Sequence, residues 1–178
     1  MRPLVVVATE AEAEHVPAGL RLVVTGIGKT AAAVATAQAM AQERPSHVVN
    51  IGSAGALRDG VTGLFEVGAV VNHDMNGDAI RALGYDPQDR LAIGSSATVL
   101  ASGDVFVTDP VVRSRLASYA HLVDMEGYAV AYAARTIGVP VTLVKHVSDN
   151  ADESALDWAD VVSVSARALG VWLAAQHW

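Results

Sequence analysis

One stretch of the sequence indicates the fold most clearly: His47-Val48-Val49-Asn50-Ile51-Gly52-Ser53-Ala54-Gly55. It is a short β-branched run followed by glycine and a small polar residue, as expected where a buried strand ends. Two later segments have the same form, and they are Val123-Asp124-Met125-Glu126-Gly127 and Val147-Ser148-Asp149. Because ligands bind at the carboxyl ends of strands in open α/β sheets, these segments predict an enzyme with a site for a small polar molecule.

The composition is that of a single α/β domain. The chain has 178 residues, of which 52% are hydrophobic and only 17% are charged. Alanine and valine dominate, which suits buried parallel strands covered by helices of small residues. This length is sufficient for one domain, residues 1–178, with a substantial core.

The composition also excludes several classes of protein. There is no cysteine, which excludes disulfides and thiolate metal sites. The net charge is −7 without any basic run, which argues against nucleic acid as a partner. The longest apolar stretch near the N-terminus, Pro3 to Ala8, is too short for a signal sequence or a membrane span. We therefore expect a cytoplasmic protein with no membrane partner, and no pattern indicates a metal or a cofactor.

Short valine-rich runs bounded by Gly, Asp or Asn predict the strands, and apolar periodicity with capping residues predicts the helices. Strands are expected at Leu4–Ala8, Leu20–Val24, His47–Ile51, Ala69–Asn72, Arg90–Ile93, Thr98–Ala101, His121–Val123 and Val141–Val147. Helices are expected at Thr30–Gln42, Pro110–Tyr119, Gly127–Ile137 and from about Ser154 to Ala175. Residues 56–102 are rich in strands and loops and show no clear helix.

Two segments imitate known binding motifs. Gly26-Ile27-Gly28-Lys29-Thr30-Ala31 fits the dinucleotide fingerprint, but no acid follows about twenty residues later to bind a ribose. Val23 also stands where a P-loop needs glycine, so we interpret the segment as a tight turn whose amides could line a site for a small anion or a sugar. The segment His73-Asp74-Met75-Asn76-Gly77-Asp78 does not fit an EF-hand and is interpreted as a polar surface loop.

Five stretches, in this order, resemble the nucleoside phosphorylase/nucleosidase superfamily, and within it most closely the 5′-methylthioadenosine/S-adenosylhomocysteine nucleosidases. They are Ala8-Thr9-Glu10-Ala11-Glu12, Thr25-Gly26-Ile27-Gly28-Lys29, Asn50-Ile51-Gly52-Ser53-Ala54-Gly55-Ala56-Leu57, Ser102-Gly103-Asp104-Val105-Phe106, and Asp124-Met125-Glu126-Gly127 followed by Val147-Ser148-Asp149-Asn150-Ala151-Asp152. The resemblance implies a single three-layer α/β domain with a central mixed, twisted sheet flanked by helices. It also implies a small-molecule purine nucleoside as ligand and a homodimer, since family members often complete the pocket from a partner chain.

Two residues would be catalytic according to this resemblance. Glu12 would be the general base for an attacking water, and Asp149 would protonate the leaving purine. The chemistry requires these residue types independently of the family. An N-glycosidic bond breaks through an oxocarbenium-like sugar, so the departing base must be neutralised as charge builds on it. A carboxylate on the water side activates the nucleophile and stabilises the cationic sugar.

The substrate-binding candidates implied by the resemblance are Ser53, Gly55, Phe106, Val107, Met125 and Glu126. Glu126 would accept hydrogen bonds from both vicinal ribose hydroxyls, for which a carboxylate is well suited. Met125 would pack on the sugar, and the Gly-Ser segment would let the backbone approach the ribose and the water. Phe106 would stack on the base, and the backbone near Val107 would read the base edge.

Each candidate also has a plainer interpretation. Glu12 lies in a cluster with Glu10 and Glu14 and could be a solvated acid. Glu126 opens a predicted helix, where an acid is favourable near the positive end of the dipole. Asp149 could cap the turn before the last helix, and Phe106 could belong to the core.

The sequence favours hydrolysis over phosphorolysis. A phosphorylase holds phosphate, normally with arginines, and the strand before the Gly-Ser segment carries none. We therefore expect a nucleosidase that releases adenine from a 5′-modified adenosine of the methylthioadenosine or S-adenosylhomocysteine type. The alternatives are a hydrolase or phosphorylase of another purine nucleoside, including futalosine-type substrates, and a nucleoside-binding module without turnover. The 5′ specificity stays open, because the chain looks shorter than typical members between Leu57 and Ser102.

Overall fold

The computed structural model of the chain describes residues 2–152, 155 and 158–177. The strands are β1 (Leu4–Val7), β2 (Arg21–Val24), β3 (Val48–Ala56), β4 (Leu64–Glu66), β5 (Ala69–Asn72), β6 (Arg90–Ala92), β7 (Val99–Ser102), β8 (Leu122–Asp124) and β9 (Val141–Asp149). The helices are α1 (Glu10–Ala13), α2 (Lys29–Gln42), α3 (Gly77–Ala82), α4 (Pro110–Ala117), α5 (Gly127–Ile137) and α6 (Trp158–Ala174).

Among the described residues, nine strands form one mixed sheet with the order β2-β1-β3-β8-β7-β5-β6. β9 pairs with β3 and with β4, which extends the sheet away from that path. β1 runs parallel to β2 and β3, and β7 runs parallel to β5 and β8. The pairs β3–β8, β4–β9 and β5–β6 are antiparallel. The predicted α/β fold with a central mixed sheet is therefore confirmed.

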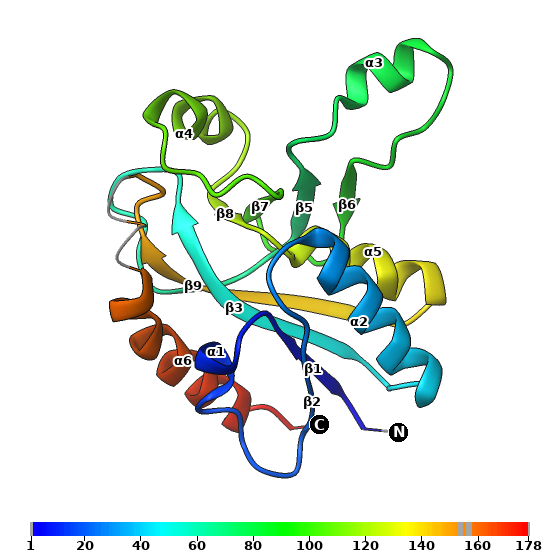
Figure 1. The fold of residues 1–178 in the computed structure, drawn as a ribbon, viewed down its shortest axis with the longest axis vertical. Helices are drawn as coiled ribbons and strands as arrows, with labels where there is room; N and C mark the ends of the chain where they lie inside the picture. The colour runs from blue at the N-terminus through cyan, green and yellow to red at the C-terminus, as the bar shows by residue number, and fades with distance from the viewer. Residues whose placement is uncertain (1, 153–154, 156–157, 178) are drawn as a thin grey trace.

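β3 is the strand around which the functional half of the sheet is arranged. It pairs with β1 along Val48–Asn50, with β9 along Val48–Gly55, and with β8 at Gly55 and Ala56. Figure 1 shows the resulting curvature of this long strand. Because β3 leaves β1 and joins β8 at its far end, the ends of β1, β8 and β9 surround one hollow.

Helices cover both faces of the sheet (Figure 1). On one face, α2 and α5 pack over Leu4 and Val6 with small residues such as Ala32 and Ala134. On the other face, α6 packs Leu169 over the alternate residues of β1. All four residues of β1 are fully buried, and each such side chain contributes about 1.5–3 kcal/mol by leaving water. In the described part of the chain, no helix has the length and apolar character that a membrane span requires.

The structure corrects the sequence predictions in several places. The Gly52–Ala56 segment does not follow β3 but continues it, and Asp149 is the last residue of β9 rather than lying beyond it. The region 56–102 contains the short helix α3, which stands away from the sheet on the β5–β6 arm (Figure 1). β4 and the one-turn helix α1 were not predicted. The predicted start of the last helix near Ser154 lies outside the described residues, and the described helix runs over Trp158–Ala174.

Candidate active site

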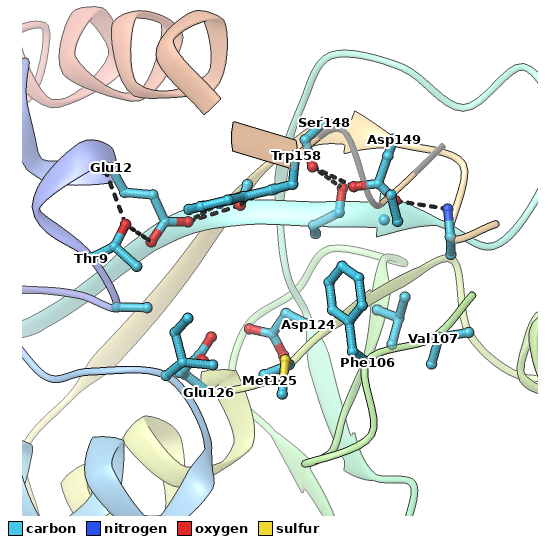
Figure 2. Close-up of a pocket in the computed structure, with 18 of the residues that line it drawn as sticks. Thr9, Glu12, Phe106, Val107, Asp124, Met125, Glu126, Ser148, Asp149 and Trp158 are labelled. Carbon is cyan, nitrogen blue, oxygen red and sulfur yellow. Dashed lines mark hydrogen bonds between the residues drawn. The ribbon is translucent and has the colours of Figure 1, made fainter. Parts of the chain in front are cut away.

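One cavity of about 310 Å³ lies where the ends of β1, β3, β8 and β9 meet, and this size suits a small molecule. Every candidate residue from the sequence lines it: Glu12, Ser53, Gly55, Phe106, Val107, Met125, Glu126 and Asp149. Figure 2 shows Glu12 and Asp149 at the two ends of one wall, with Trp158 between them. Glu126, Met125 and Phe106 form the facing wall. The fold therefore brings together residues that lie far apart in the sequence.

The one-turn helix α1 fixes Glu12 in the cavity. Thr9 is its N-cap, accepts a hydrogen bond from the Glu12 amide at 3.3 Å, and donates its hydroxyl to Oε2 at 3.3 Å. Oε1 of Glu12 accepts hydrogen bonds from the Ser53 amide at 2.7 Å and from the Ser53 hydroxyl at 2.8 Å. Glu12 is only 4% exposed. The interpretation of Glu12 as a solvated surface acid is therefore wrong.

The glycines of β3 make room for carboxylates. A Cβ on Gly52 would lie 3.2 Å from both Glu12 Oε1 and Lys145 Nζ. A Cβ on Gly55 would lie 2.9 Å from Asp149 Oδ1. Glycine within a strand often marks such a close approach, and it does not by itself end the strand. This requirement explains why the segment expected to turn continues as β3.

Glu126 precedes α5 without capping it. The carboxylate accepts a hydrogen bond from the Gly28 amide at 2.8 Å instead. The first amides of α5 are satisfied by Asp124, which accepts from Gly127 N at 2.9 Å, and by Ser102, whose hydroxyl accepts from Tyr128 N at 2.9 Å. Glu126 is therefore free to present its carboxylate to the cavity, and the helix-dipole interpretation does not account for its position.

The surroundings of Glu126 shift its protonation. Burial and the neighbouring Asp124 carboxylate raise the pKa of Glu126, with a smaller contribution from Glu12. The Lys145 ammonium and the Gly28 amide act in the opposite direction. The net result is a pKa of about 7, so Glu126 changes charge near neutral pH.

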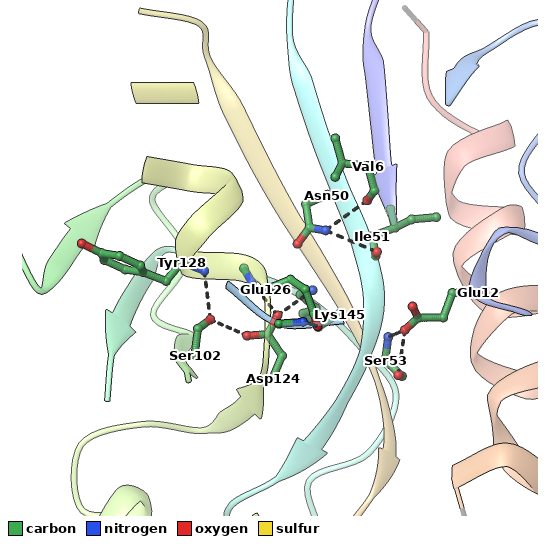
Figure 3. A network of polar contacts seen from close by, with 12 residues as sticks. Val6, Glu12, Asn50, Ile51, Ser53, Ser102, Asp124, Glu126, Tyr128 and Lys145 are labelled. Atoms are coloured by element: carbon green, nitrogen blue, oxygen red, sulfur yellow. Dashed lines mark hydrogen bonds and ion pairs between the residues drawn. The ribbon is translucent and has the colours of Figure 1, made fainter. Parts of the chain in front are cut away.

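Lys145 is a functional candidate that the sequence analysis missed. It lies in β9, is 1% exposed, and pairs with Asp124 Oδ2 at 2.8 Å (Figure 3). Burial lowers the pKa of Lys145, but the charges of Asp124 and Glu126 outweigh burial and raise it. The buried ammonium of Lys145 therefore interacts electrostatically with both glutamates that line the cavity. The signal in the sequence was a lysine directly after the apolar residues Leu143 and Val144 of a valine-rich strand, where an unpaired buried charge would not be tolerated.

Asp149 is held at the opposite end of the same wall from Glu12. Its Oδ2 accepts from the Ser148 hydroxyl at 2.6 Å, and its Oδ1 accepts from the Ala151 amide at 2.8 Å. The second contact is a local turn of the kind expected for a capping aspartate. Asp149 nevertheless lines the cavity, so the turn orients the carboxyl group toward the ligand space.

Trp158 was also missed. It begins α6, lines the cavity, and donates its indole N–H to Ser53 Oγ at 2.7 Å. Ser53 in turn donates to Glu12, so a tryptophan supports the wall that carries the candidate base. Nothing in the local sequence pattern distinguishes Trp158 from a core aromatic residue, because its contact with β3 depends on the tertiary fold.

The end of the cavity beside Asp149 is lined mainly by apolar side chains. Phe106 is 49% exposed, so the interpretation as a core aromatic is wrong. It lies on the loop after β7, next to the buried Val107, and faces the wall of Asp149 (Figure 2). An exposed aromatic face at the mouth of a cavity can stack on a planar ligand.

The Gly26–Lys29 turn does bind anions, but they belong to the chain itself. The Gly28 amide donates to Glu126, and the Lys29 amide donates to Asp104 Oδ1 at 2.7 Å. The second polar segment forms the loop into α3, where Asn76 Oδ1 accepts from the Ala79 amide at 3.1 Å. Among the described residues, no group of three or more His, Cys, Asp or Glu side chains is arranged to hold a metal ion.

Comparison with known proteins shows where this arrangement belongs. A family model described as the phosphorylase superfamily matches residues 19–88 and 78–171. The 5′-methylthioadenosine/S-adenosylhomocysteine nucleosidase of Shewanella piezotolerans is 27% identical, over 82% of this chain and 76% of the relative.

Solved structures agree in fold. Futalosine hydrolase from Helicobacter pylori matches with a TM-score of 0.85 at 23% identity, over 98% of this chain and 97% of that one. The 5′-methylthioadenosine/S-adenosylhomocysteine nucleosidase of Neisseria meningitidis, solved with methylthio-immucillin-A, matches with a TM-score of 0.79 at 26% identity, over 98% of this chain and 100% of that one. The nucleoside phosphorylase-like architecture predicted from the sequence is therefore confirmed.

Proposed function

The chain belongs to the phosphorylase superfamily, and from that membership we propose that it is a purine nucleosidase. It hydrolyses the N-glycosidic bond of a 5′-modified adenosine, of the methylthioadenosine or S-adenosylhomocysteine type, to adenine and the free sugar. The observation that carries the proposal is one wall of the cavity with a fixed carboxylate at each end, Glu12 and Asp149. The names of the S. piezotolerans relative and the N. meningitidis structure support the same activity.

In the proposed reaction, water attacks the anomeric carbon as the C–N bond breaks. Glu12 takes one proton of the water, and the remaining hydroxyl becomes part of the sugar. The electron pair of the broken bond leaves with the purine, and the Asp149 carboxyl group gives a proton to an imidazole nitrogen of the base. Proton exchange with solvent then restores Glu12 and Asp149 for the next turnover.

Ser53 and Glu126 prepare the sugar end for this step. Ser53 donates two hydrogen bonds to Oε1 of Glu12, while Oε2 accepts one longer hydrogen bond from Thr9 at 3.3 Å and keeps a lone pair for the water. Ionised Glu126 accepts hydrogen bonds from two ribose hydroxyls. The carboxylates of this end also stabilise the positive charge that develops on the sugar, and they act without reorganisation because they are already fixed.

Water is favoured over phosphate as the nucleophile because the anion-binding groups near the cavity are already engaged. The amides of Gly28 and Lys29 bind Glu126 and Asp104, and the Lys145 ammonium binds Asp124. Among the described residues that line the cavity, none is arginine or lysine. A phosphate anion would therefore meet carboxylates rather than cations.

The test is a panel of nucleosides in phosphate-free buffer, with free base and free sugar as the readout. We expect adenine from 5′-methylthioadenosine and from S-adenosylhomocysteine, at a rate that added phosphate does not change. Turnover of futalosine alone would assign the related hydrolase activity, which the H. pylori structure carries in its name. A sugar 1-phosphate product would make the chain a phosphorylase, and binding without any base release would leave a nucleoside-binding module.

The proposal includes a homodimer. The arm that carries α3 exposes large apolar side chains, with Leu83 75% exposed and Tyr85 71% exposed. Such side chains on a projecting segment favour burial against a second copy. Sedimentation should give a dimer at assay concentration, and a fully active monomer would contradict this part of the proposal.

A further inference from the structure

Lys29 connects loops that come from widely separated strands. Its Nζ donates to Asn72 Oδ1 at 2.7 Å and to Asp74 Oδ1, and it lies 3.8 Å from Asp104 Oδ2. β2, which precedes Lys29, is at one end of the sheet order, whereas β5 and β7 lie beyond β8. The ammonium therefore ties the loop after β2, across the strand ends, to the loops after β5 and β7.

The backbone of the same turn binds Asp104 a second time and also binds Glu126. The Lys29 amide donates to Asp104 Oδ1 at 2.7 Å, and the Gly28 amide donates to Glu126 Oε1 at 2.8 Å. Asp104 also donates its own amide to Asp74 Oδ2 at 2.7 Å, which closes a ring of contacts around the ammonium. Gly28 has φ +96°, and a Cβ there would lie 3.1 Å from Asp104 Oδ1, so only glycine fits this turn.

We propose that Lys29 is a positioning residue for the reaction in the cavity, an inference that rests on the proposed function. Its ammonium holds the 26–29 turn so that the Gly28 amide reaches Glu126. It also holds Asp104, and through it the start of the loop that carries Phe106 and Val107. Lys29 does not line the cavity, so it acts only through these neighbours.

Partial burial strengthens the ion pair between Lys29 and Asp74, because little water screens the two charges. Its side chain is 17% exposed and that of Asp74 is 23% exposed. Burial alone would raise the pKa of Asp74, but the hydrogen bonds from Lys29 and from the Asp104 amide, and the Lys29 charge, lower it further than burial raises it. Asp74 is therefore ionised at neutral pH. An ion pair shared among several acceptors restrains the loops more than a single exposed pair would.

Glu126 provides a readout that a purely structural role would not change. The groups that act on its protonation are Asp124, Glu12, Lys145 and the Gly28 amide. Of these, the amide belongs to the turn that Lys29 holds. Loss of a backbone hydrogen bond to a carboxylate raises the pKa of that carboxyl group, by about one unit for a single donor. Removing the ammonium should therefore move the acid limb of the kcat/KM profile to higher pH.

The experiment compares Lys29→Met with Arg21→Met in the full chain. Arg21 is the matched control because it begins β2 and its guanidinium donates to the carbonyls of Ala39 and Glu43, at the end of α2 opposite Lys29. For Lys29→Met we expect kcat/KM for 5′-methylthioadenosine to fall between about 10- and 100-fold, as for other displaced positioning groups, and the acid limb to rise by about one unit. Arg21→Met should change neither quantity.

A second variant keeps the inference testable if Lys29→Met does not fold. Asp74→Asn removes the charge of the main partner of Lys29. Asp74 does not line the cavity, so the substitution leaves the lining unchanged. It should shift the acid limb in the same direction, and where both variants fold, the double variant should be no worse than Lys29→Met alone. An unchanged limb and unchanged kcat/KM in a folded Lys29→Met or Asp74→Asn protein would overturn the inference.

The protonation of Glu126 can also be measured without turnover. A carboxyl ¹³C NMR titration, with the Glu126 signal assigned by its absence in Glu126→Gln, should show the same upward shift in Lys29→Met. If no nucleoside is hydrolysed but this shift is present, the proposed function fails while the link between Lys29 and Glu126 stands. If nucleosides are hydrolysed and the shift is absent, the inference about Lys29 fails alone.

Discussion

The two ends of the cavity are built on different physical principles. The sugar end is the end where the proposed ribose would lie. It contains the buried groups Glu12, Glu126, Asp124 and Lys145, which are fixed by short hydrogen bonds. Among the described residues, the base end, beside Asp149, is lined by that acid, by Ser148 and otherwise mainly by apolar side chains. The difference indicates that charge stabilisation is prearranged where the proposed cationic sugar would form, whereas the proposed base would be held by surface contact beside one carboxyl group.

The largest expected effect addresses whether both ends are equally necessary for the chemistry. Asp149→Asn and Glu12→Gln each preserve size and remove one carboxyl function. We expect kcat to fall by about 10²–10⁴-fold in both, as for other general acid and base residues. Steady-state kinetics with 5′-methylthioadenosine and thermal unfolding provide the measurement and the folding control. A nearly active, folded Asp149→Asn enzyme would show that the leaving base is protonated from elsewhere.

The next effect tests how much stability depends on the charged end. Lys145→Met leaves Asp124 buried without its partner, and breaking such a pair costs about 3–5 kcal/mol. Arg113→Met is the control, because Arg113 pairs with Asp59, whose side chain is 95% exposed, and such a pair is worth less than about 1 kcal/mol. Urea denaturation of both variants gives the comparison. Equal losses would mean that the buried pair is not a special feature of the sugar end.

Protonation of Glu126 gives an effect of intermediate size. Its pKa in the folded protein is about 7, above the ordinary value of 4.5, so folding favours the protonated form. This stabilisation is complete below pH 4.5 and is lost as the pH rises through about 7, with a total on the order of 3 kcal/mol. The free energy of unfolding of the unliganded wild type should therefore fall more steeply than that of Glu126→Gln between about pH 4.5 and pH 7, the window between these two pKa values. Parallel curves for the two proteins would contradict this assignment.

Activity should respond to the same group in the opposite direction. Only ionised Glu126 can accept from both ribose hydroxyls, so kcat/KM of the wild type should rise with pH through about 7. Measured as kcat/KM against pH, this rise should be absent in Glu126→Gln.

The smallest effect is expected at the base end. Phe106→Ala removes a stacking surface worth about 1–3 kcal/mol for a nucleobase. KM should rise accordingly, while the melting temperature changes little because Phe106 is 49% exposed. A large loss of stability with unchanged KM would place Phe106 in the fold rather than in the site.

Much of this molecule could be predicted from local patterns. The strand cores and the helices α2, α4 and α5 follow from valine runs, caps and apolar periodicity. The eight candidate site residues all line one cavity, while their roles stay predictions. The extension of β3 was missed because its glycines were interpreted as a turn, whereas they accommodate Glu12 and Asp149. The roles of Lys145 and Trp158 were missed because their partners, Asp124 and Ser53, lie far from them in the sequence, and local patterns do not predict such contacts.

The continuous strand β3 also sets a length scale for the cavity. Ser53, which binds Glu12, and Gly55, which adjoins Asp149, are two residues apart on one face of the strand, or about 6.6 Å. Both carboxyl groups therefore take their positions from one continuous strand, so a substitution that moves β3 would displace Glu12 and Asp149 together.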